Sequence, residues 1–168
     1  RGSLKYLADT GRLDQVSRGV YTLPEVWEDE FVSIQERYKR GVFALDTALF
    51  LHDLTDRTPH KFHMAFPYGY NTSSPKAAGI LCSCKKEPYY SLGIALVDTP
   101  AGNTVRVYNA EKTLCEILKP ISHTDIQIIT DAFKRYAGRK DKNIPLLSEY
   151  AHQLRVEKRL RPYLEVLL

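Results

Sequence analysis

Cysteine and histidine are the residue types best suited to metal binding or nucleophilic chemistry, and this chain of 168 residues has three cysteines and five histidines. Cys82 and Cys84 would place both thiols on one side of a strand, and Cys115 with His123 would complete four ligands for zinc. A Cys-x-Cys pair lacks the usual zinc-knuckle spacing, so we interpret all three cysteines as free thiols and predict no metal. Their odd number fits a reducing compartment better than a disulfide framework.

A second candidate set is formed by Asp98, Glu111 and Lys112, which are the residue types of a nuclease site. Glu111 and Lys112 are adjacent in the chain instead of alternating along a strand, so helix capping and a salt bridge are the better interpretation. The chain also has no glycine-rich phosphate loop and no GxSxG motif. The sequence therefore predicts a protein that is not an enzyme and that holds no cofactor.

Cations and exposed aromatic rings are the third kind of candidate, because they bind nucleic acid. Residues 134–161 carry nine basic and three acidic side chains, so this segment has a charge of +6 within a chain of +4. We predict that a polyanion contacts Arg139, Lys140 and Lys142, the alternative being a solvated charged face. The loop of Tyr68 and Tyr70 and the pair Tyr89-Tyr90 would stack on RNA bases, unless these rings pack in the core.

The first 24 residues have the pattern of a DNA-recognition helix followed by a wing. Apolar residues share one face over residues 4–8, and two short strands, 13–16 and 20–23, are joined by Ser17-Arg18-Gly19. In a winged helix-turn-helix such a helix enters the major groove, and the hairpin lies along the DNA backbone. The cationic contacts would then be Lys5, Arg12 and Arg18. The alternative is a surface helix and hairpin whose polar face is merely solvated.

The chain begins at Arg1-Gly2-Ser3, without a methionine and without room for the two helices that precede a recognition helix. We therefore expect it to be truncated inside the DNA-binding domain. No apolar run reaches the roughly 18 residues of a membrane span, and no apolar secretion signal opens the chain. We expect a soluble, cytoplasmic protein.

Hydrophobic periodicity predicts the elements that would position these residues. Helices are expected at 29–40, 46–54, 109–118, 124–138 and in two stripes around Leu147 and Leu160. Strands are expected at 62–66, 80–84, 90–97 and 104–108, and residues 42–45 are a short apolar run. Asp46 and Asn109 are the expected N-caps of two helices. Thr124 with Gln127 forms a capping box for a helix whose buried stripe includes Ile126.

These elements predict an α+β fold with two parts. Residues 1–24 would be the remnant of a winged helix-turn-helix, containing the recognition helix and the wing. Residues 25–168 would form a mixed domain with a small mixed or antiparallel sheet and a C-terminal helical bundle.

Four motifs occur in an order that we associate with a known family. They are SRGVYTLP (residues 17–24), ALDTALFLHDLTDRTP (44–59), FPYGYN (66–71) and VYNAEKTLCEIL (107–118). In this order the chain resembles AbiEi, the antitoxin and transcriptional regulator of AbiE-type abortive-infection systems. The resemblance spans nearly the whole chain, up to the segment 146–151, although each motif alone is weak.

The resemblance implies a cytoplasmic antitoxin of type IV, with an N-terminal winged helix and a larger C-terminal antitoxin domain. Such a protein represses its own operon by binding inverted repeats, and it counteracts a nucleotidyltransferase toxin without a stable complex. Ser3, Lys5 and Tyr6 would contact the DNA groove, and Arg12 and Arg18 the DNA backbone. Because the first helices of the winged helix are missing, we expect this chain to bind DNA weakly and to keep its antitoxin function. The alternative is a regulator that responds to a ligand or RNA and has no toxin partner.

Overall fold

A computed structural model of the protein describes residues 14–17, 20–22 and 29–167. The described residues fall into two compact units, which are treated separately here. The first contains the described residues up to Lys39 together with Asp98–Val105, and the second contains Arg40–Val97 and the chain from Arg106 onward. In the described part of the chain no helix is both long and apolar enough to cross a membrane.

The first unit contains the predicted hairpin. Strands β1 (Asp14–Ser17) and β2 (Val20–Thr22) are antiparallel, and Asp14 lies opposite Thr22. The two predicted strands are therefore confirmed, and their role as a wing stays a prediction. The expected recognition helix at residues 4–8 and the turn at Arg18-Gly19 lie outside the described residues.

Helix α2 (Glu30–Arg37) lies in the same unit and begins as the sequence predicts. The Asp29 carboxylate accepts the backbone N–H of Phe31 at 3.1 Å, which caps the helix. Its other oxygen accepts hydrogen bonds from the Thr99 hydroxyl and, at 3.0 Å, from the Asn103 amide. Asp29 thereby connects the start of α2 to the turn at residues 99–103.

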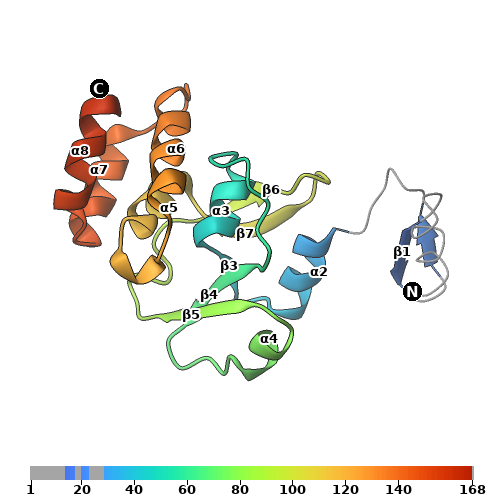
Figure 1. Ribbon diagram of the computed structural model, residues 1–168. Coiled ribbons are helices and arrows are strands. Elements are labelled where there is room, and N and C mark those ends of the chain that lie inside the picture. The colour runs from blue at the N-terminus through green and yellow to red at the C-terminus, as the bar shows by residue number, and fades with distance from the viewer. Residues whose placement is uncertain (1–13, 18–19, 23–28, 168) are drawn as a thin grey trace. The chain divides into compact units, whose positions relative to one another are not determined.

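Five strands form a mixed sheet in the order β5-β4-β3-β7-β6 (Figure 1). Pairing is parallel between β4 and β5 and between β3 and β7, and antiparallel between β3 and β4. The sequence predicts four of these strands, β7 with its exact bounds, whereas β3 lies in residues 42–45, which are predicted only to be a short apolar run. The bounds are β3 Val42–Phe43, β4 His63–Pro67, β5 Leu81–Lys85, β6 Ile94–Asp98 and β7 Thr104–Tyr108.

The predicted helical bundle is present in the second unit, where α7 packs against α5 and α8, and α8 against α6 (Figure 1). The elements of this unit outside the sheet are α3 Leu45–Leu51, α4 Ser73–Ala77, α5 Ala110–Ile117, the 3-10 helix η1 Pro120–Ser122, α6 Ile126–Ala137, α7 Ile144–Gln153 and α8 Glu157–Leu167.

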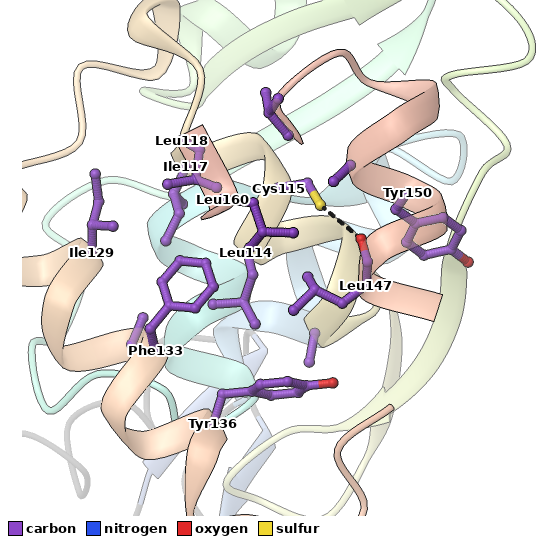
Figure 2. Close-up of a cluster of buried hydrophobic side chains, with 14 of the residues drawn as sticks. Leu114, Cys115, Ile117, Leu118, Ile129, Phe133, Tyr136, Leu147, Tyr150 and Leu160 are labelled. Carbon is purple, nitrogen blue, oxygen red and sulfur yellow. Dashed lines mark hydrogen bonds between the residues drawn. The ribbon is translucent and has the colours of Figure 1, made fainter. Parts of the chain in front are cut away.

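The bundle encloses the largest apolar cluster of the described chain. Figure 2 shows Leu114 of α5 among Phe133 and Tyr136 of α6 and Leu147 of α7, and all four are essentially inaccessible to solvent. Phe133 also stacks on Tyr163 of α8, with ring centroids 4.4 Å apart. Burying such rings supplies most of the stability of a bundle of this size.

Three local expectations about helix starts are wrong. Ala44 occupies the N-cap of α3, so Asp46 lies in the first turn of that helix. Asp125 caps α6 by accepting the N–H of Gln127 at 2.7 Å, so Thr124 forms no capping box there. Ile126 is the first residue of α6 and is 63% exposed, so it does not belong to the buried stripe.

Candidate functional site: a buried polar layer under α5

Helix α5 is the central element of the candidate site because all eight of its residues are buried, charged ones included. It follows directly on β7, and the Asn109 side chain caps it by accepting the N–H of Lys112 at 2.9 Å, as the sequence predicts. Buried polar groups are stable only where they have partners. The polar residues of α5 that need them are Glu111, Lys112, Thr113 and Glu116.

The Lys112 side chain has no exposed surface. Its ammonium donates a hydrogen bond to the Tyr89 carbonyl and lies 3.5 Å from the centroid of the Tyr108 ring, a cation–π contact. Burial lowers the pKa of Lys112 to about 7. The backbone of Gly93 packs closely beside it, since a Cβ there would lie 3.0 Å from the Cβ of Lys112.

Glu116 is the second buried charge, and it joins α5 to the sheet. The ammonium of Lys85 on β5 lies 2.8 Å from one oxygen of Glu116, which is 3% exposed. The other oxygen has no hydrogen-bond partner among the described residues, and neither has Nε2 of His63 on β4. Burial and then the positive charge of Lys85 lower the pKa of His63 to about 4, so its ring is neutral at pH 7.

Glu111 connects α5 to the helical bundle. Its carboxylate accepts a hydrogen bond from the Tyr136 hydroxyl at 2.5 Å. The oxygen of this hydroxyl in turn accepts a hydrogen bond from the backbone N–H of Asn143 at 2.6 Å. Burial, followed by the hydrogen bond to Glu111, raises the pKa of Tyr136. Glu111 and Lys112 therefore have separate partners, and neither acts in the helix cap or salt bridge expected from the sequence.

A chain of tyrosines and carbonyl groups extends the layer along β7. Tyr108 donates to the Tyr90 carbonyl at 2.7 Å, and Tyr90 donates to the Arg40 carbonyl at 2.6 Å. Nε2 of His52 lies 2.8 Å from the Tyr108 carbonyl oxygen, so this nitrogen carries the proton. These bonds tie α3, β7 and the 86–93 segment together.

The layer is suited to holding the fold rather than to chemistry on a substrate. Lys112 has the lowered pKa of a candidate base, but its enclosure by Tyr89, Gly93 and Tyr108 leaves no surface for a reacting group. The sequence interpretation missed His63, Lys85 and Glu116. The one available signal was a lysine and a glutamate four residues apart in a helix whose other positions are largely apolar.

The predicted thiol and metal positions are dispersed. Cys82 is half-buried and Cys84 exposed on β5, whereas Cys115 is buried in the bundle with its thiol 3.6 Å from the Leu147 carbonyl (Figure 2). Among the described residues no three His, Cys, Asp or Glu side chains form a group able to hold a metal ion. Asp98, the remaining member of the nuclease set, is exposed at the end of β6.

The predicted nucleic-acid contacts have different outcomes. Ser3, Lys5, Tyr6, Arg12 and Arg18 all lie outside the described residues, so their DNA contacts stay predictions.

Of the predicted polyanion contacts, Arg139 is committed to the fold. Its guanidinium makes two 2.9 Å bonds to Asp141 and donates to the His52 carbonyl at 2.7 Å. Lys140 and Lys142 are exposed, and a polyanion contact at these residues stays a prediction.

The aromatic candidates separate into rings in the fold and rings on the surface. Tyr90 is buried, and Tyr70 stacks on Phe66 with centroids 4.5 Å apart. Tyr68 and Tyr89 are exposed, by 69% and 38%.

Comparison of the chain with models of known protein families, and with curated protein sequences, finds no significant match.

Proposed function

We propose that this protein is the antitoxin of a type IV abortive-infection system, counteracting a nucleotidyltransferase toxin and repressing its own operon through the N-terminal helix and wing. The observation that carries the proposal is the order of the four motifs along the chain, which resembles that of AbiEi.

The packing of the motifs is consistent with this proposal. The motif at 44–59 forms α3, the motif at 107–118 forms the end of β7 and α5, and the two are joined by the bond from His52 to Tyr108. The motif at 66–71 ends β4 and contains the Phe66–Tyr70 stack. The motifs at 44–59 and 107–118 also share the apolar cluster that contains Leu49, Leu54 and Leu114, which gives a physical reason for these two motifs to occur together.

A toxin-rescue assay tests the proposal. If a nucleotidyltransferase gene adjoins the gene for this chain, cells that express it should form colonies only when this chain is co-expressed. Because a type IV antitoxin needs no stable complex, affinity-tagged toxin should not retain the chain. Failure of the well-folded chain to restore growth would contradict antitoxin action.

Variants separate antitoxin action from repression. Replacing Arg12→Gln and Arg18→Gln should weaken the shift of promoter DNA while leaving rescue unchanged, because only the DNA contact depends on these charges. The matched control is Lys61→Gln with Arg57→Gln, two exposed cations on another loop. Promoter binding without rescue in the wild type would favour a regulator that has no toxin partner.

A further inference from the structure

A groove of about 860 Å³ lies in the second unit between the 86–93 segment and the junction of α7 with α8. An aromatic residue, Tyr89, and several charged residues of the segment 152–159 line it. The lining residues include Tyr89, His152, Arg155, Glu157, Lys158 and Arg159.

The cations of this groove are available to a ligand. Arg155, Lys158 and Arg159 are exposed, and no acidic side chain of the described chain lies within ion-pair distance of them. Glu157 is the one acidic residue of the lining, and it lies 3.2 Å from His152. Lys158 and Arg159 belong to the first turn of α8, where the helix dipole adds positive potential. The groove therefore attracts anions.

The aromatic side of the groove is held in place by its backbone. The Tyr89 carbonyl accepts the buried Lys112 ammonium, and Glu87 accepts the N–H of Ser91 at 3.0 Å and its hydroxyl at 2.6 Å. Tyr89 is 38% exposed and lines the groove. A ring on a fixed turn stacks on a planar ligand with little loss of conformational entropy.

A second aromatic and cationic pair includes Lys86, three positions before Tyr89 in the chain. The Lys86 ammonium is 5.0 Å from the centroid of the Tyr68 ring, and Tyr68 is 69% exposed. The backbone carbonyl of Lys86 accepts a hydrogen bond from the N–H of Tyr90 at 3.0 Å, so Lys86 belongs to the same turn as Tyr89. Cations and exposed rings thus occur both in the groove and on the neighbouring surface.

We propose that this groove binds single-stranded nucleic acid, with Arg155, Lys158 and Arg159 on phosphates and Tyr89 stacked on a base. Unpaired bases expose the faces that stack on tyrosine, whereas a duplex hides them. The inference concerns a site other than the N-terminal helix and wing, and it holds whether or not the chain neutralises a toxin.

The test uses a fluorescein-labelled oligouridylate of about twelve nucleotides and measures its affinity for the whole chain by fluorescence anisotropy. The groove variant combines Arg155→Gln, Lys158→Gln and Arg159→Gln. The control variant combines Arg57→Gln, Lys61→Gln and Lys76→Gln, which removes the same charge from exposed side chains outside the groove.

Three phosphate contacts to a single strand correspond to a slope of about −2 in log affinity against log salt. The groove variant should lose about this much of the slope, and its affinity at about 50 mM salt should fall at least tenfold. The control variant should change affinity less than threefold at about the same salt. Equal weakening of both variants, or absence of binding by the wild type, would overturn the proposal.

Tyr89 supplies the second readout, which separates stacking from general attraction of phosphates. Tyr89→Ala should weaken oligouridylate binding about tenfold, whereas Tyr89→Phe keeps the ring and should bind like the wild type. The affinity for a DNA duplex of equal length should be the same in Tyr89→Ala as in the wild type. The proposal would be refuted if Tyr89→Ala bound the single strand as tightly as the wild type does, or if it lost as much affinity for the duplex as for the single strand. Either result would show that Tyr89 does not stack on a base.

Discussion

At the scale of single residues, Lys112 is the most unusual group of the described chain. Its ammonium is enclosed by a carbonyl, an aromatic ring and the backbone of Gly93. Glu116, the acidic group that does most to raise its pKa, is itself paired to Lys85 at 2.8 Å. A charge in this position is stabilised less than it would be in water, which is why its pKa falls to about 7.

Replacing Lys112→Met should alter the dependence of stability on pH. Between about pH 7 and the ordinary lysine value of 10.5, the unfolded chain holds a proton at this amine that the folded chain lacks. The free energy of unfolding of the wild type therefore rises with pH across this window, by at most about 1.4 kcal/mol per pH unit. Methionine cannot titrate, so this rise should be absent from the variant.

Urea unfolding followed by circular dichroism at about pH 7 and about pH 9 measures the difference. The wild type should gain roughly 2 kcal/mol relative to Lys112→Met over this interval. The exposed Lys140→Met is the control and should follow the wild type. Parallel profiles for the wild type and Lys112→Met would contradict the assignment of this rise to Lys112.

At the scale of elements, α5 holds the second unit together because its polar residues contact different neighbours. Glu111 bonds to α6, Lys112 to the 86–93 segment and Glu116 to β5, while the Cys115 thiol faces α7. A helix with apolar residues in these places would pack, but it would not fix the same set of partners so specifically.

The ion pair between Lys85 and Glu116 should couple strongly in a double-mutant cycle. Glu116→Gln or Lys85→Met alone should lower the free energy of unfolding by roughly 2–4 kcal/mol, because each leaves a charge without its partner in the layer. The double variant should lose less than the sum, with a coupling of about 1–3 kcal/mol.

The ion pair of Arg135 and Asp131 on α6 provides a matched comparison, because its charged atoms are 2.9 Å apart, against 2.8 Å for Lys85 and Glu116. Its side chains are 35% and 44% exposed, so solvent screens their attraction and the coupling should be about 0.5 kcal/mol or less. Equal couplings for the two pairs would show that burial of Glu116 does not strengthen its bond to Lys85.

At the scale of the whole molecule, local patterns predicted elements well and contacts between them poorly. Asn109 before an amphipathic run located α5, and alternation located β4 and β7, because these signals depend on neighbouring residues. Helix α4 has five residues with serines and a proline and gives no periodic signal. The order of strands in the sheet is likewise not encoded in any single segment.

The candidate site depends on that unpredicted order. His63 and Lys85 reach the same layer because β4 pairs in parallel with β5, and Glu116 of α5 reaches it through its ion pair with Lys85. Tyr89 and Lys158 line the same groove although 68 residues separate them in the sequence. Exposed and buried tyrosines also look alike in sequence, so Tyr89 and Tyr90 could be told apart only in the folded chain.

The uneven charge of the chain gives a last prediction, on promoter DNA. If Lys140 and Lys142 contact its phosphates, Lys140→Gln with Lys142→Gln should lower the slope of log affinity against log salt by about 2. Arg139→Gln should instead lower the melting temperature, because Arg139 holds Asp141 and the His52 carbonyl within the fold. Electrophoretic shifts at several salt concentrations and thermal melts measure both effects. Unchanged binding of the lysine variant at low salt would leave these two side chains as solvated surface, and the DNA contact would then belong to Arg12 and Arg18.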